Sequence, residues 1–231
     1  VGLHGGQAQY VRVPLAQSTL MPIPDGMNNE VALLLGDNLS TGYFAAALAD
    51  IGPGDVCVTI GCGTVGLLSV QSAIRRGCES IIAIDPNESR VRTARNLGAE
   101  ATADAERAVE WVAERTGGRG ADAVMELVGL PEAQRLAYRL IRPGGTMSVI
   151  GCHCTPGFSF SPAEAYDKNL TYRTGRCPAR YFMSELAEGL VDNPPDLAWC
   201  VTHRFGIEQA ELAYDTFAFG KDDCIKAVIE F

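Results

Sequence analysis

Short runs of consecutive apolar residues alternate with amphipathic stretches through the middle of the chain. Four clear runs and a weaker fifth occur in this order: Val56–Ile60, Ser80–Ile84, Ala101–Thr102, Ala123–Val128 and Thr146–Ile150. Continuous rather than alternating apolar character is typical of strands that are buried on both faces. The stretches between the runs have helical periodicity, so the pattern predicts an α/β fold, a doubly wound parallel sheet with helices on both faces.

The two ends of the chain follow a different pattern. Residues 8–14 alternate as a strand does, and a helix is expected from about Asn29 to Leu35, but residues 1–36 are too short to bury a core of their own. After Gly151 we expect the following elements: a loop over 152–162, a strand at Leu170–Thr174, helices at Arg180–Leu190 and Ile207–Phe219, and a closing edge strand at Ile225–Phe231.

A glycine-rich turn follows the first apolar run and leads into a helix expected at Leu67–Arg76. Its sequence is Gly61-Cys62-Gly63-Thr64-Val65-Gly66. The pyrophosphate of a dinucleotide requires this order of strand, glycine turn and helix N-terminus. Gly61 permits the tight turn, Gly63 lets backbone approach phosphate, and Gly66 lets the helix pack closely on its strand. A lone motif of this type has low specificity, so the rest of the chain has to support it.

Asp85 ends the second apolar run, nineteen residues after Gly66. A carboxylate at this point can accept both hydroxyls of the adenosine ribose, and it would repel a 2′-phosphate. The position therefore predicts NAD rather than NADP. The alternative is a solvated turn aspartate before Pro86.

Composition excludes several classes of protein. The chain is 47% hydrophobic and 20% charged with a net charge of −9, and it has no basic stripe, so nucleic acid is not an expected partner. No apolar run is long enough to span a membrane, and no signal peptide is recognised. The eight cysteines form no CxxC pair, and we interpret them as reduced thiols of a cytoplasmic protein.

The histidines do not indicate a metal site. His4 lies near the chain start, and His203 is expected in a structural turn. Cys152-His153-Cys154 has metal-ligating residue types, but in extended backbone alternate side chains point to opposite faces, and no fourth ligand is evident.

Several separated features together resemble the zinc-containing, medium-chain alcohol dehydrogenases. They are Gly36–Tyr43 before a Gly-Pro-Gly turn, the glycine motif, Asp85, Gly120–Val124, Arg142–Gly145, Thr202–Phe205 and Lys226–Phe231. The resemblance runs from about Gly6 to the C-terminus. It implies a Rossmann-type NAD-binding domain over 39–175, flanked by remnants of a GroES-like catalytic domain at 1–38 and 176–231. The family's first zinc ligands have no counterpart in this sequence.

The resemblance also implies roles for individual residues. Asp37 matches the last ligand of the catalytic zinc, with the N-cap of the following helix as the alternative, and Thr41 matches a residue beside the nicotinamide. Other cofactor contacts are implied as follows: Val65 behind the nicotinamide, Arg90 near the adenosine ribose, Lys226 at the pyrophosphate, and Val128, Ile150 and Gly151 at strand ends. For Thr41, Arg90 and Lys226 the alternative is ordinary packing or a surface charge.

Three functions remain open at this stage. The first is an NAD-dependent oxidoreductase of the zinc alcohol dehydrogenase type, which transfers hydride between a small alcohol or aldehyde and NAD. The second is a non-catalytic NAD-binding module. The third is the zinc-free quinone reductase branch, against which Asp37 and Asp85 argue. Family members pair through the sheet edge that corresponds to Leu170–Thr174, so a homodimer or homotetramer is expected. The substrate itself is not identified.

Overall fold

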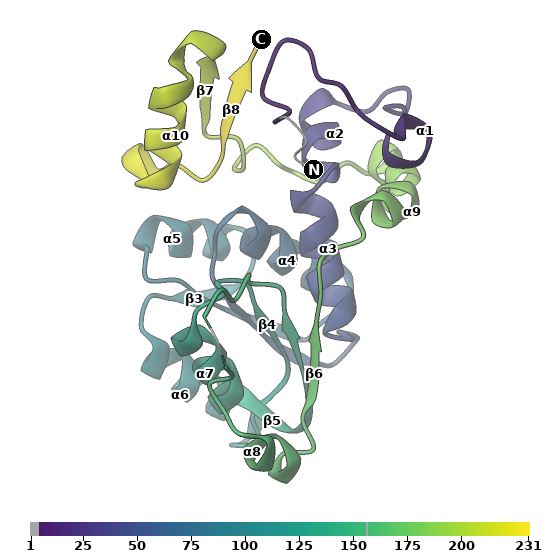
Figure 1. Cartoon of the computed structure of the whole chain (residues 1–231). Helices are drawn as coiled ribbons and strands as arrows, with labels where there is room; N and C mark the ends of the chain where they lie inside the picture. The colour runs from purple at the N-terminus through teal and green to yellow at the C-terminus, as the bar shows by residue number, and fades with distance from the viewer. Residues whose placement is uncertain (1–4, 156) are drawn as a thin grey trace. The chain divides into compact units, whose positions relative to one another are not determined.

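The chain divides into two compact units, which Figure 1 shows. The computed structural model describes residues 5–155 and 157–231, so His4 lies outside the described residues. The sheet unit is the continuous segment Asp37–Pro178, and the terminal unit combines residues 5–36 with Ala179–Phe231. The assignment of the terminal unit to a catalytic domain stays a prediction.

A six-stranded parallel sheet forms the core of the sheet unit, in the order β3-β2-β1-β4-β5-β6. The strands are β1 Val56–Ile60, β2 Ser80–Ile84, β3 Glu100–Thr102, β4 Ala121–Glu126, β5 Ile141–Val149 and β6 Thr171–Thr174. Every residue of β1 is buried, as its continuous apolar sequence predicts. The strand order reverses between β1 and β4, which confirms the Rossmann-type fold and places a ligand crevice at their carboxyl ends.

Helices cover both faces of this sheet (Figure 1). They are α3 Asn38–Leu48, α4 Thr64–Arg75, α5 Glu88–Asn96, α6 Ala105–Thr116, α7 Pro131–Leu140 and α8 Pro162–Asp167. α4 packs against α3 and α5, and α6 packs against α7. The contact of α3 with α4 is close because Gly42 faces Leu68, where a Cβ would lie 2.8 Å from the Leu68 Cβ.

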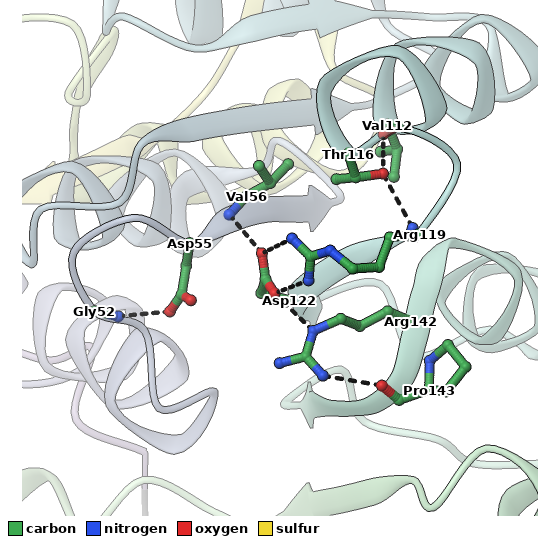
Figure 2. Close-up of polar contacts among 10 residues, drawn as sticks. Gly52, Asp55, Val56, Val112, Thr116, Arg119, Asp122, Arg142 and Pro143 are labelled. Carbon is green, nitrogen blue, oxygen red and sulfur yellow. Dashed lines mark hydrogen bonds and ion pairs between the residues drawn. The ribbon is translucent and has the colours of Figure 1, made fainter.

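Asp122 holds the amino-terminal ends of three strands together (Figure 2). Its carboxylate accepts hydrogen bonds from the Val56 amide at 3.0 Å, from Arg119 Nη1 at 2.5 Å and from Arg142 Nε at 2.6 Å. Burial raises the pKa of Asp122, but these donors outweigh burial and hold the pKa down to about 2. The charged form of this side chain therefore stabilises the junction of β1, β4 and β5.

The terminal unit is small and contains few strands. Its elements are α1 Ala16–Thr19, α2 Asn29–Leu35, α9 Ala179–Asp192, β7 His203–Gly206, η1 Ile207–Gln209, α10 Ala210–Ala218, η2 Lys221–Asp223 and β8 Ala227–Glu230. β7 and β8 pair in parallel, and α2 packs against α9. Arg204 of β7 forms an ion pair with Glu30 of α2, which joins the two sequence segments of the unit.

Two sequence predictions about the ends of the chain are wrong. Residues 8–14 form no strand in the described chain, because nothing there pairs with them, and Tyr10 is 92% exposed. His203 lies in strand β7 rather than in a turn, since β8 supplies a hydrogen-bonding partner. The expected loop over 152–162 is confirmed for the described residues up to Ser161, and α8 begins at Pro162 after a capping box formed by Ser161 and Glu164.

Among the described residues no single helix is long and apolar enough to cross a membrane. The consecutive helices α2 and α3 pass that test only when they are taken together, by length and composition alone.

Candidate functional site

The glycine turn between β1 and α4 has the backbone that its sequence predicts. Gly61 has φ +93°, and a Cβ there would lie 2.8 Å from Val128 Cγ2. A Cβ on Gly66 would lie 1.8 Å from the Gly61 carbonyl oxygen, so only glycine lets α4 begin so close to the strand. Gly63 differs, because a Cβ there would meet no atom within 4 Å among the described residues. The protein's own packing therefore leaves open space beside Gly63.

The N-terminus of α4 presents the group that an anion requires. The helix begins at Thr64, Gly63 occupies the N-cap position, and no side-chain cap bonds to the helix there. An uncapped helix start offers backbone N–H groups and the positive end of the helix dipole. Burial raises the pKa of the Cys62 thiol to about 12, with the Asp85 charge adding to the shift, so this turn residue stays neutral. The turn thus fits the pyrophosphate of a dinucleotide.

Asp85 anchors the glycine turn to the end of β2. It is only 4% exposed, and its Oδ2 accepts the Cys62 amide at 2.8 Å while its Oδ1 accepts the Asn87 amide at 2.9 Å. Arg90 Nη1 lies 3.6 Å from Oδ2. The alternative of a solvated turn aspartate is therefore wrong. The surface alternative for Arg90 also loses support, because its guanidinium pairs with this buried carboxylate.

A cavity of 820 Å³ opens at the carboxyl ends of β1 and β2. Ile60, Gly61, Ile84 and Val128 contribute to its wall, which is mainly apolar. Its volume lies within the range of about 300–1,000 Å³ that is usual for small-molecule sites. The cavity lies at the switch point of the sheet, where ligands bind in open α/β folds.

A second cavity, of 560 Å³, brings several predicted residues together. Asp37, Thr41, Ile150 and Gly151 all line it. The Thr41 hydroxyl donates a 3.1 Å hydrogen bond to Asp37 Oδ1. Asp37 occupies the N-cap position of α3, as the structural alternative predicts, but its carboxylate accepts no hydrogen bond from the helix amides. Burial raises the pKa of the neighbouring Cys177, although a hydrogen bond with Thr41 opposes the shift.

Glu126 and His153 form a buried pair that sequence reasoning missed. Glu126 is fully buried, and its Oε1 accepts the Val128 and Gly129 amides at 2.7 and 2.8 Å. Its Oε2 lies 2.8 Å from His153 Nε2. The pair thereby ties the loop after β4 to the loop after β5, and each loop lines one of the two cavities. The available signal was a glutamate at the end of an apolar run.

The described residues do not form a zinc site. No group of three or more His, Cys, Asp or Glu side chains among them has the geometry to hold a metal ion. Catalytic zinc takes about three protein ligands, and the role of Asp37 as one of them stays a prediction. His153 directs Nε2 to Glu126.

Lys226 belongs to the terminal unit, so its predicted contact with the pyrophosphate stays a prediction. It is partly buried and lines a cavity of 210 Å³ with Gln7 and Tyr214. Its backbone oxygen accepts the amides of Thr202 and His203.

The strand order and the glycine turn define a Rossmann-type α/β protein, and comparison with known proteins refines this class. A model of the zinc-binding dehydrogenase family matches residues 64–190. Zinc-type alcohol dehydrogenase B of Aspergillus flavus is 39% identical over 224 residues, which cover 93% of this chain and 52% of that protein. An alcohol dehydrogenase of Cupriavidus necator is 35% identical over 234 residues, covering 99% of this chain and 63% of that protein.

Solved structures agree with these relatives. The alcohol dehydrogenase TADH from Thermus sp. ATN1 superposes with a TM-score of 0.91 at 32% identity, over 99% of this chain and 68% of that one. The chain therefore belongs to the zinc-binding dehydrogenase family, as its sequence motifs predicted. It spans 52% and 63% of the length of the two curated relatives named above.

Proposed function

We propose that this chain is the NAD-binding part of an oxidoreductase of the zinc alcohol dehydrogenase type. One observation carries the proposal: the buried Asp85 carboxylate anchors a glycine turn that leaves open space at Gly63. Family membership supports the reaction class, since the relatives are named alcohol dehydrogenases. When bound, NAD would supply the hydride acceptor.

The residues of the sheet unit would divide the work of holding NAD. The turn from Gly61 to Gly66 and the uncapped N-terminus of α4 would bind the pyrophosphate. The apolar cavity beside Val128 would take the adenine side. The cavity with Thr41, Ile150 and Gly151 would take the nicotinamide side and exclude water from it.

Asp85 favours NAD over NADP on electrostatic grounds. Its carboxylate is buried beside Arg90, and each oxygen keeps a lone pair for a ribose hydroxyl beyond the amide that it already accepts. A 2′-phosphate would bring a second negative charge into a site with little water, where like charges repel strongly.

Asp37 would be one ligand of a catalytic zinc ion in the complete enzyme. The other ligands would come from residues beyond the described ones, because no three-ligand group occurs among these. We therefore expect this chain on its own to bind NAD without oxidising an alcohol. The second interpretation, a non-catalytic NAD-binding module, describes the chain in that state.

The protein is proposed to work in the cytoplasm as a homodimer or homotetramer. The eight cysteines are all free thiols, which suits a reducing compartment. The edge strand β6 offers unpaired backbone groups that a second copy could pair with.

Titration with NADH and NADPH tests the cofactor proposal. NADH is expected to bind more tightly than NADPH. Gly63→Ala should weaken NADH binding about tenfold or more, equivalent to about 1.4 kcal/mol, because the new methyl group would occupy the space meant for phosphate. Its effect on folding should be small, since the Cβ meets no neighbour and Gly63 has an ordinary φ of −69°.

Gly52→Ala is the matched control, because a Cβ there also meets no atom within 4 Å of the described structure and the residue lies before β1, at the opposite end of the strand from the glycine turn. It should leave NADH binding unchanged. Equal or tighter binding of NADPH would remove the assignment of Asp85. Oxidation of a small-alcohol panel by this chain with added zinc would contradict the expected absence of turnover.

A further inference from the structure

Two of the eight cysteines differ from the rest in exposure. Cys152 and Cys154 are exposed, and their Sγ atoms lie 4.0 Å apart. The others divide into four buried thiols, at Cys57, Cys62, Cys200 and Cys224, and two partly buried ones, at Cys78 and Cys177. An oxidant in solution therefore reaches Cys152 and Cys154 before the other hydrogen-bonded thiol pair, in which Cys57 is buried and Cys78 partly buried.

The side chain of the intervening His153 is anchored away from the two thiols, which lie near each other. His153 directs its ring to the buried Glu126, with Nε2 at 2.8 Å from Oε2. The loop is also held at its start, because the Gly151 amide donates to the Glu126 carbonyl oxygen at 3.0 Å. At Gly129 a Cβ would lie 2.7 Å from the Cys152 nitrogen, so the two loops pack backbone to backbone. The thiols thus stand side by side on an anchored loop.

A disulfide between these residues needs only a short movement. The sulfur atoms have to approach from 4.0 Å to about 2.05 Å, the S–S bond length. Two side-chain rotations can share that change of about 2 Å, while the backbone stays attached through Gly151 and His153.

We propose that Cys152 and Cys154 form a reversible dithiol–disulfide pair that reacts with hydroperoxides. One thiolate sulfur attacks a peroxide oxygen, the O–O bond breaks, and a sulfenic acid and one water form. The second thiol then attacks that sulfenic sulfur, the S–S bond forms, and a second water leaves. Two thiols are oxidised by two electrons in total, and one hydrogen peroxide is reduced to two waters.

Cys152 is the attacking thiol and Cys154 the resolving one. The hydrogen bond with Cys152, together with the charge of Cys152, raises the pKa of Cys154, which disfavours Cys154 as the attacking thiolate. Cys152 also lines the 560 Å³ cavity that contains Asp37 and Thr41. Formation of the disulfide therefore changes the wall of the cavity that is proposed to hold the nicotinamide. This effect on cofactor binding rests on the proposed function.

Thiol counting and mass spectrometry on the complete reduced chain test the disulfide. After one equivalent of hydrogen peroxide, the denatured protein should lose two of its eight alkylation sites and about 2 Da of mass. Peptide mapping should place the link between residues 152 and 154, and dithiothreitol should restore all eight thiols. Phenylarsine oxide, which binds close dithiols, should be retained in one equivalent by the reduced chain.

Cys154→Ser should abolish both the mass loss and the retention of phenylarsine oxide. Cys78→Ser, which breaks the second hydrogen-bonded thiol pair by removing the partner of Cys57, is the matched control and should change neither. A link to any other cysteine, or peroxide oxidation of Cys78 or Cys177 before the pair, would overturn the proposal.

Titration of the reduced and the oxidised chain with NADH then measures how the disulfide changes the affinity of the cavity for the cofactor. The oxidised form should bind more weakly, while Cys152→Ser, which lacks the attacking thiol, should bind equally before and after peroxide. Equal affinity of the two wild-type forms would refute the effect on the cavity. Absence of NADH binding in both forms would refute the proposed function, whereas the disulfide is judged by mass alone.

Discussion

Asp122→Asn tests whether one buried charge stabilises the junction of β1, β4 and β5 at their amino-terminal ends. The substitution keeps the size of the side chain and its ability to accept the Val56 amide, but it removes the charge that faces Arg119 and Arg142. The carboxyl is only 10% exposed, so solvent screens these pairs little. Its pKa falls from the ordinary value of 3.8 to about 2 in the folded chain. At about 1.4 kcal/mol per pKa unit, the charge stabilises the fold by about 2 kcal/mol.

The pH dependence has a definite sign. Because the folded pKa lies below the unfolded one, the unfolded chain binds the proton more readily as the pH falls. The stabilisation is therefore complete above about pH 4 and is lost as the pH falls toward about 2. Asp122→Asn should cost about 2 kcal/mol at pH 7, and the difference from the wild type should shrink through this window.

Urea unfolding followed by fluorescence provides the measurement. Trp111 lies in α6 of the sheet unit, so a Trp199→Phe background leaves it as the single reporter of that unit. Glu106→Gln is the matched control, because Glu106 pairs with Arg139 through two hydrogen bonds but is 68% exposed. Its effect should be much smaller. Equal stability of Asp122→Asn and the wild type at pH 7, or a difference that does not change between pH 5 and pH 3, would refute the reasoning.

Two further predictions concern the loops and the sheet edge. Glu126→Gln should lower the free energy of unfolding by about 1–3 kcal/mol, because it removes a buried charged acceptor. A double-mutant cycle with His153→Asn, measured by urea unfolding, should give a coupling energy above about 0.5 kcal/mol. Additive effects of the two substitutions would show that the pair does not act as one unit. Light scattering should find the chain to be a dimer or larger. Thr174→Lys, at the exposed end of β6, should weaken that association. A monomeric wild-type chain would contradict pairing through this edge strand.

The sequence was most informative where local chemistry decides structure. Val56–Ile60 is apolar throughout and became the fully buried β1, and the turn that follows it requires glycine for steric reasons that spacing alone reveals. The predicted doubly wound sheet is also confirmed, because it too was inferred from local apolar runs. Helix starts shifted by a few residues: α4 begins at Thr64 rather than Leu67, because the glycine turn itself supplies the first helical positions.

Features that depend on distant partners could not be predicted in this way. Glu126 and His153 are 27 residues apart, and only the packing of two loops brings them together. Residues 8–14 show the opposite error, since an alternating pattern describes a strand only if another strand lies beside it. The distance between the thiols of Cys152 and Cys154 likewise depends on where His153 is anchored.

The division of the chain has a consequence for the order in which its parts can fold. The sheet unit is one uninterrupted segment, whereas the terminal unit needs both ends of the chain, as the Arg204–Glu30 ion pair and the β7–β8 ladder illustrate. During synthesis at about 5–20 residues per second, residues 5–36 emerge on the order of ten seconds before Ala179–Phe231. We expect the sheet to form in that interval. Residues 5–36 would meanwhile lack their packing partners, so the apolar residues of α2 would be exposed and accessible to chaperones.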